Sequence, residues 1–208
     1  MRILLLLLLA LPVRAEHIAG GGGGTVSVAA GDLLYTAMPL TGGINGQYIV
    51  RRLSAEGGVF WELKTGLGRG EEPTAIATAP GGGVVVAGAH KTGCFVARFD
   101  ASGRSVWDIS PSASGQCRPA GVVTDNEGGA YLLATVDGRA GYDAMVWKFT
   151  PRGDVAWSYR HSSVDPLYAQ NLYLDPRGDR LRAFILRKRG TDFIEEFFRL
   201  DLAGRLLQ

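Results

Sequence analysis

Short apolar runs separated by polar, glycine-rich turns make up most of this chain. Runs rich in Val, Ile, Leu, Phe and Tyr flank turns of three to five residues built from Asp, Pro, Asn, Ser and Gly. Such turn residues either bond the backbone ahead of them or adopt a positive φ, so the pattern is typical of β-hairpins. A 3.6-residue periodicity is missing, which excludes a helical solenoid. We therefore expect an all-β fold.

Two hairpin motifs alternate along the chain with one shared period. The glycines of the first motif are spaced 46, 50 and 51 residues apart: Gly57, Gly103, Gly153 and Gly204. Those of the second motif are spaced 51, 46 and 50 residues apart: Gly31, Gly82, Gly128 and Gly178. Two hairpins form a four-stranded antiparallel unit of about 50 residues, the size of one propeller blade. The repeats predict a β-propeller with four blades at residues 24–64, 72–110, 119–160 and 168–208, with the first hairpin of each blade innermost.

Two residue types recur at fixed places in this repeat. Trp61, Trp107 and Trp157 each stand four residues after a glycine of the first motif. Because this position falls in an outer strand of successive blades, we expect the rings to pack at blade junctions rather than to stack on a ligand. Aspartates recur at turn entries, where we expect them to cap turns rather than to bind a metal: Asp100, Asp125, Asp175 and Asp201.

The repeat resembles those of bacterial extracellular β-propellers. The pattern Phe99-Asp100-x-x-Gly103-x-x-x-Trp107, followed by Asp125-x-x-Gly128-Gly129-x-Tyr131, is similar to the repeat of seven-bladed-type propellers. The stretch from Gly57 to Gly66 looks like the tryptophan-docking motif of quinoprotein-like propellers. The resemblance covers nearly all of the expected mature chain. It implies the architecture but not an activity, since propellers host many functions.

Some features depart from those families. Their members usually have six to eight blades, whereas four are counted here, and the fourth repeat has Gln208 where the others have tryptophan. The sequence is compatible with a closed four-bladed ring, with a segment of a longer propeller, and with two chains that share a larger ring. Quinoprotein dehydrogenases also hold a quinone and calcium with adjacent cysteines and an acidic cluster, which this chain lacks, so we expect no cofactor.

The first residues have the pattern of a secretory signal peptide. Arg2 precedes a continuous apolar stretch from Leu4 to Leu11, and small residues lead to an expected cleavage before Glu16. The stretch is too short for a membrane anchor, which needs roughly 20 apolar residues. We expect a signal peptide at 1–15, a flexible glycine-rich leader at 16–23 and a propeller domain at 24–208. The mature protein would then be secreted or periplasmic, with no membrane span.

The chain contains two cysteines, Cys94 and Cys117. In an oxidising compartment they could pair and close a loop of about 24 residues, worth roughly 3 kcal/mol. The alternative is two isolated thiols, and the spacing does not choose between them.

Composition and spacing argue against several classes of site. The net charge is +2 and the cations are dispersed, so no nucleic-acid role is expected. His17, His90 and His161 lack metal-ligand spacing to one another, and we expect no metal site. A Gly-x-Ser-x-Gly elbow is missing, and no catalytic residue is predicted.

One face of the expected propeller gathers the loops that join blades and those between second and third strands. The repeat alignment makes Glu72, Arg118 and Tyr168 equivalent positions near the mouth of the central channel. His161 and a basic run belong to the same face. Because a rigid scaffold positions its loops for binding, the candidate binding residues are Glu72, Arg118, His161, Tyr168, Arg187, Lys188 and Arg189.

These observations favour a non-enzymatic binding or scaffold module whose partner is a protein or an anionic glycan at the cell envelope. The alternative is a hydrolase or lyase that acts on an extracellular polymer at the channel mouth. That activity needs side chains such as Tyr168, His161, Glu72 and Arg118 to converge, because proton transfer requires an approach of about 3 Å.

Overall fold

The computed structural model describes residues 24–40, 46–113 and 115–207. The expected signal peptide and leader, residues 1–23, lie outside the described residues, as does Gln208. All regular structure in the described part is β-strand, and that part contains no helix able to cross a membrane.

The described strands form four antiparallel sheets of four strands each, and every sheet keeps the chain order. Blade 1 contains β1 (Val26–Ala30), β2 (Leu33–Pro39), β3 (Tyr48–Ser54) and β4 (Val59–Thr65). Blade 2 contains β5 (Glu72–Ala79), β6 (Gly83–His90), β7 (Gly93–Phe99) and β8 (Ser105–Ile109). Blade 3 contains β9 (Cys117–Thr124), β10 (Ala130–Gly138), β11 (Gly141–Phe149) and β12 (Val155–His161). Blade 4 contains β13 (Leu167–Leu174), β14 (Arg180–Arg189), β15 (Asp192–Asp201) and β16 (Leu206–Leu207). The predicted all-β architecture of four four-stranded propeller blades is confirmed.

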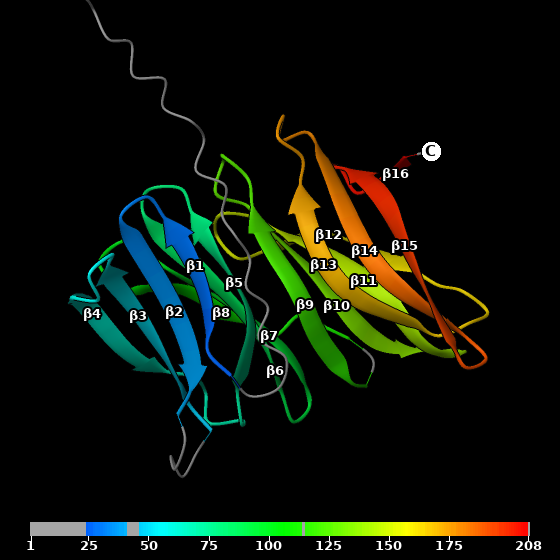
Figure 1. Cartoon of the computed structure of the whole chain (residues 1–208), viewed down its shortest axis with the longest axis horizontal. Helices are drawn as coiled ribbons and strands as arrows, with labels where there is room; N and C mark the ends of the chain where they lie inside the picture. The colour runs from blue at the N-terminus through cyan, green and yellow to red at the C-terminus, as the bar shows by residue number, and fades with distance from the viewer. Residues whose placement is uncertain (1–23, 41–45, 114, 208) are drawn as a thin grey trace, which may run out of the picture.

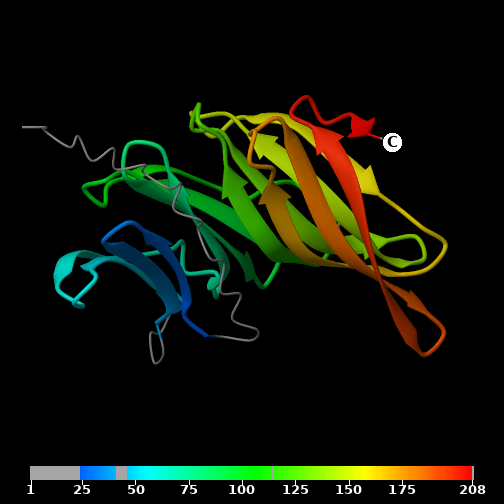
Figure 2. The ribbon, with the colours of Figure 1, turned by 45° about the horizontal axis from the view of Figure 1, so that its top comes forward.

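The four blades stand side by side in an open arc, with blade 1 and blade 4 at opposite ends (Figure 1, Figure 2). The inner strands are neighbours in the order β1, β5, β9 and β13. One apolar cluster joins blades 1 and 2, a second joins blades 2 and 3, and a third joins blades 3 and 4. Among the described residues no such cluster joins blade 4 to blade 1. The arc therefore differs from the closed four-bladed ring, which was one of the alternatives compatible with the sequence.

The burial of the second strands follows from their place in the arc. β6 lies between two neighbouring blades, and its residues from Gly83 to Gly88 are all buried. β14 lies in the end blade, where Leu181, Ala183 and Ile185 are buried while Arg182 is exposed and Phe184 half-buried. A strand covered on both faces reads as a continuous apolar run, and a strand covered on one face alternates. Blade 4 thus leaves one of its faces open.

Tryptophans join successive blades in one repeated way. The indole Nε1 atoms of Trp61, Trp107 and Trp157 donate to the carbonyl oxygens of Ala101, Pro151 and Leu202, at 2.9, 3.1 and 3.0 Å. Each ring also lies against a turn glycine of the next blade, where a Cβ atom would come within 2.8 Å of the ring: Gly103, Gly153 and Gly204. The rings therefore pack at blade junctions, as the repeat predicts.

The turn aspartates bond the backbone of their own turns. Asp100 Oδ1 accepts hydrogen bonds from the N–H groups of Ser102 and Arg104. Asp125 and Asp201 each accept two bonds in the same manner, and Asp175 accepts one, from the N–H of Asp179. Within the described ranges no group of three or more His, Cys, Asp or Glu side chains is placed to hold a metal ion.

Candidate binding site on the loop face

A bulge near the start of each inner strand of blades 2 to 4 fixes the register of the loop face. The pairing with the second strand skips Thr74 in β5, Ala120 in β9 and Gln170 in β13. Glu72, Arg118 and Tyr168 each lie two residues before the bulge, paired with Ala89, Thr135 and Leu186. The three residues thus occupy equivalent positions on neighbouring blades.

An aromatic row connects two of these positions at the junction of blades 3 and 4. The guanidinium carbon of Arg118 lies 5.9 Å from the centre of the Tyr142 ring. The Tyr142 and Tyr168 ring centres are 5.3 Å apart, and those of Tyr168 and Phe193 are 5.9 Å apart. We call Tyr142, Tyr168 and Phe193 the aromatic row. Arg118 and Phe193 are exposed and the two tyrosines are half-buried, so the row forms a surface rather than a core.

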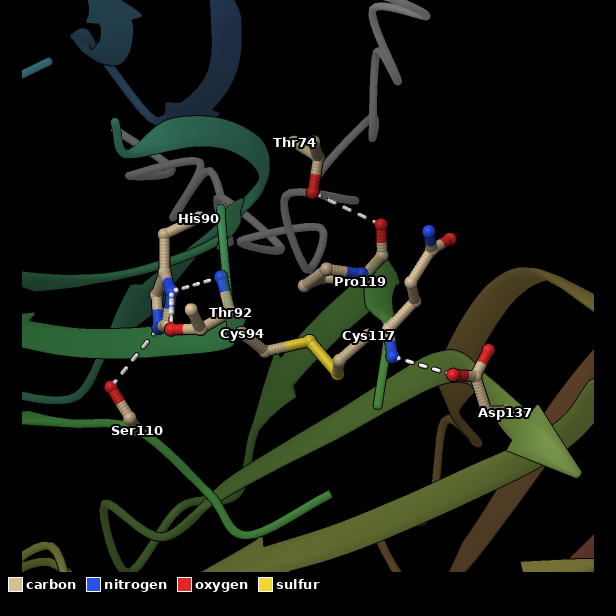
Figure 3. The surroundings of a disulfide bond; sticks show 9 residues. Thr74, His90, Thr92, Cys94, Ser110, Cys117, Pro119 and Asp137 are labelled. Carbon is tan, nitrogen blue, oxygen red and sulfur yellow. Dashed lines mark hydrogen bonds between the residues drawn. A yellow bond between two sulfur atoms is a disulfide. The ribbon is translucent and has the colours of Figure 1, made fainter. Parts of the chain in front are cut away.

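The start of β9 holds Arg118 in place. Cys94 of β7 and Cys117 of β9 form a disulfide between blades 2 and 3, with Cα atoms 5.3 Å apart (Figure 3). The structure thus pairs the cysteines whose partnership the spacing left open. The N–H of Gln116 donates to Asp137, and Pro119 accepts a hydrogen bond from the Thr74 hydroxyl of blade 2. Arg118 itself donates to the Gln116 side chain at 2.9 Å. Its guanidinium is therefore positioned before a ligand arrives.

The basic run lies at the other end of the row, in the hairpin between β14 and β15. Lys188 is the strand partner of Phe193, and Lys188 and Arg189 are both exposed. Arg187 behaves differently, because it donates to Glu196 at 2.7 Å and is half-buried. Two of the three predicted cations are thus presented to solvent, and the third is neutralised within its own blade.

His161 lies at the end of the outer strand β12, in a pocket of aromatic and charged groups. Its ring stacks on Phe198 with centres 4.5 Å apart and lies 6.3 Å from the Tyr159 ring. Burial lowers the pKa of His161, and the nearby Arg187 lowers it further, against smaller opposing effects of Glu196 and Asp143. The imidazole is packed as an aromatic plane, and no ring contact or hydrogen bond between it and the aromatic row occurs among the described residues.

The residues that a catalytic site would require are not brought together. In the described part of the chain, no hydrogen bond or ion pair joins any two of Glu72, Arg118, His161 and Tyr168, and the contact between Arg118 and Tyr168 runs through Tyr142. Glu71, the sequence neighbour of Glu72, is buried and accepts hydrogen bonds from the N–H groups of Leu67 and Arg69. Glu71 therefore stabilises the loop before β5, a role that the sequence did not reveal.

Sequence reasoning missed Tyr142 and Phe193. Phe193 had a readable signal, because Phe193 and Ile194 are adjacent apolar residues directly after a turn and both remain exposed, at 56% and 40%. Tyr142 had no such signal in the sequence, since its contact with Tyr168 depends on how blade 4 packs against blade 3. The opposite face has a shallow hollow lined in part by Arg98, Asp100 and Pro151. These residues are already engaged in turns and blade junctions, so the loop face remains the candidate site.

No protein-family model matches this chain, and no curated protein is similar to it in sequence. Solved structures share its fold. A Bacteroides caccae protein of unknown function superposes with a TM-score of 0.50 at 13% identity, over 84% of this chain and 57% of that one. The Pan2 WD40 domain of Neurospora crassa gives 0.52 at 10% identity, over 93% and 64%. Puromycin hydrolase, as an S511A mutant, gives 0.54 at 15% identity, over 88% and 28%.

These similarities show the propeller fold alone. The chain spans less than two thirds of the length of each of these proteins. The proteins include a WD40 domain and a hydrolase, so the shared fold is compatible with both binding and catalysis.

Proposed function

We propose that this protein is a non-enzymatic binding module whose loop face takes an anionic glycan at the cell envelope. The observation that carries the proposal is the aromatic row Tyr142, Tyr168 and Phe193, with Arg118 at one end and the Lys188–Arg189 hairpin at the other. The export that an envelope role requires rests on the sequence pattern of residues 1–15 and is part of the proposal.

The chemistry of the row suits an extended, charged polymer. Flat aromatic faces contact apolar faces of a ligand, and a few fixed polar groups give orientation. Cations at both ends of the row attract negative charges that are spaced along a chain, with an attraction that salt screens over roughly 10 Å at 0.1 M. A sugar polymer with carboxylate or sulfate groups offers both kinds of surface.

The same geometry favours binding over turnover. General acid–base catalysis needs a proton donor and acceptor within about 3 Å of the reacting atoms. Tyr168 and Arg118 contact other rings, and His161 is stacked on Phe198. The described residues of the loop face therefore supply contacts for a ligand but no assembled acid–base pair.

The test is calorimetric titration of the protein with polygalacturonate, with a neutral glucan and polyglutamate as comparison polymers. We expect binding to polygalacturonate that weakens steeply with salt, and about fivefold weaker binding for Phe193→Ala, from the loss of roughly 1 kcal/mol of aromatic contact. Arg118→Gln should reduce the salt dependence. Phe60→Ala and Arg152→Gln are matched controls, because Phe60 is 60% exposed in blade 1 and Arg152 is exposed on the opposite turn face.

Three outcomes are informative. Selective loss in the loop-face variants supports the proposal. Equal binding of polyglutamate means that charge alone is recognised, and the glycan assignment is then wrong. Release of reducing ends from polygalacturonate by the unaltered protein overturns the non-enzymatic role.

A further inference from the structure

Blade 4 carries on its open face the repeated cation that, in arginine form, joins blade 1 to blade 2 and blade 2 to blade 3; the equivalent Lys148 of blade 3 instead pairs with Asp125 of its own blade. A cation lies five residues before the turn glycine of every blade: Arg52, Arg98, Lys148 and Arg199. Arg52 donates to the carbonyl of Ala101 in blade 2, and Arg98 donates to the carbonyls of Gly128 and Pro151 in blade 3. Within the described residues the Arg199 side chain makes no hydrogen bond or ion pair, and it lies instead over the Phe197 ring, 5.7 Å from the ring centre.

Blade 1 carries the matching acceptor, also without a partner. In blades 2 and 3 the carbonyl two residues before the turn glycine accepts both a tryptophan and an arginine, at Ala101 and Pro151. The equivalent carbonyl in blade 1 belongs to Ala55. No hydrogen bond to it occurs in the described part of the chain. Gly57 is exposed and nothing lies within 4 Å of its Cβ position, whereas Gly103 and Gly153 are buried under tryptophan rings.

Much of the rest of the two end faces is apolar, and it is more exposed on blade 4 than on blade 1, where Thr36 and Ile49 of the same face are buried. On blade 4, Tyr173 and Phe197 are 47% and 50% exposed, and Phe184 packs against both rings. On blade 1, the corresponding face of β2 and β3 carries Leu34, Met38 and Leu53, which are half-buried. Arg182 and Arg199 lie on the blade 4 face, and Glu56 is exposed on the blade 1 turn. The cation of the blade 1 face, Arg51, is already paired with Glu62, so the free charges of the two faces are complementary.

We propose that these two faces join two copies of this chain head to tail, with blade 4 of each copy packed on blade 1 of the other. Arg199 then donates to the carbonyl of Ala55 in the partner copy, as Arg52 does to Ala101 within the chain. Because the two faces differ, the contact between copies is heterologous. A closed pair of copies forms this contact twice, so that no end face of either copy is left exposed. Two arcs of four blades make eight, which lies within the range of known propellers.

The curvature needed for closure is close to what a propeller of similar size provides. An eight-bladed ring turns by about 45° at each blade, against about 51° in a seven-bladed ring. The chain covers 57% and 64% of two propeller-like structures of the same fold, so one copy spans a little over half of such proteins. One copy therefore supplies half of the blades of an eight-bladed ring.

The first test is light scattering of the purified protein over a range of concentrations. We expect a mass of two chains, with no larger species at high concentration because the pair is closed. Arg199→Glu and Phe197→Asp on blade 4 should each raise the dimer dissociation constant at least about tenfold, as losses at a buried anchor do. Val155→Asp is the control, because Val155 is 52% exposed on an outer strand away from both end faces. A monomer at all concentrations overturns the proposal, and open-ended growth overturns closure.

A mixing experiment separates head-to-tail pairing from pairing between two blade 4 faces. Leu53→Asp alters the blade 1 face and should weaken association as much as Arg199→Glu does. A mixture of the two variants contains pairs with one intact junction, so association should partly recover on mixing. Normal dimerisation of Leu53→Asp shows that blade 1 takes no part, and head-to-tail pairing is then wrong. Circular dichroism and thermal melts of each variant verify that the blades still fold.

Discussion

The indole Nε1 of Trp157 donates a hydrogen bond of 3.0 Å to the carbonyl oxygen of Leu202, across the boundary between blades 3 and 4. The same bond recurs from Trp61 and Trp107 at the two earlier boundaries. In each case one side chain both fills the junction and satisfies a carbonyl of the next turn. The stability of the arc should therefore depend strongly on these three residues.

Replacing Trp107 by alanine tests this dependence. Trp107 is buried between blades 2 and 3 and contacts Phe149, with ring centres 6.2 Å apart. Its truncation leaves a cavity and removes one of the two donors to the Pro151 carbonyl, the other being Arg98, so we expect the free energy of unfolding to fall by about 3 kcal/mol or more. Urea denaturation measures the loss. Val106→Ala is the control, because Val106 is 49% exposed and should change stability by less than about 0.5 kcal/mol.

The turn glycines under the tryptophans provide a matched pair of substitutions. Gly153 has φ of +94° and a Cβ there would lie 2.8 Å from the Trp107 ring, whereas Gly178 has φ of +73° and open space around it. Both alanine variants pay the strain of a positive φ, on the order of 1 kcal/mol. Gly153→Ala must also displace the ring, so its unfolding free energy should fall at least about twice as far. Equal losses for the two variants would show that the Trp107 ring can move aside at no cost in stability.

Removal of the disulfide should loosen the boundary between blades 2 and 3. Cys94 and Cys117 are buried, at 0% and 4% exposure, and they join β7 to β9. A cross-link that closes a loop of about 24 residues is worth roughly 3 kcal/mol. Cys94→Ala with Cys117→Ala should lower stability by about this amount in urea denaturation. Full reduction of the unaltered protein should give a similar loss, and no loss by either route would contradict the assignment.

The fold could be predicted from the sequence because each blade repeats the same local chemistry. Asp100 and Gly103 define a turn by themselves, and their equivalents recur at a regular period, so strand order and blade number follow without knowledge of distant contacts. The open arc could not be read in this way. Whether blade 4 returns to blade 1 depends on the angle at three junctions, which no single turn encodes.

The candidate site was predictable in part for the same reason. Arg118 and Tyr168 were found as equivalent positions of a repeat, and the bulges at Ala120 and Gln170 keep that equivalence in the structure. Tyr142 lies in a third strand, and it links the two residues through contacts between different elements. The pairing of Arg187 with Glu196 likewise depends on the register of β14 and β15. Such contacts are set by packing rather than by spacing.

The turn aspartates predict loss of stability in acid. Hydrogen bonds from Ser102 and Arg104 hold the pKa of Asp100 well below its ordinary value, and bonds from Arg205 and Ala203 lower that of Asp201. A carboxyl whose pKa is lower in the folded state stabilises the fold above its unfolded pKa of about 3.9, and this contribution is lost as the pH falls toward the folded value. The thermal midpoint should therefore drop between about pH 5 and pH 2.5. Ser102→Ala should make the drop shallower, since it removes a donor to Asp100; an unchanged slope would place the acid sensitivity elsewhere.

His161 predicts a second, separate dependence on pH nearer to neutrality. Burial against Phe198 and the charge of Arg187 lower its pKa in the folded protein, and the carboxylates of Glu196 and Asp143 oppose this only in part. The unfolded chain then binds a proton more readily than the folded one below about pH 6.5, so stability falls as the pH is lowered from 7.5 to 5.5. His161→Phe keeps an aromatic ring against Phe198 but cannot be protonated, and its thermal midpoint should be flat over this range. If the variant keeps the slope of the unaltered protein, the imidazole is not the group that responds. If it loses the slope while binding at the aromatic row is unchanged, His161 serves the packing of blades 3 and 4 rather than ligand recognition.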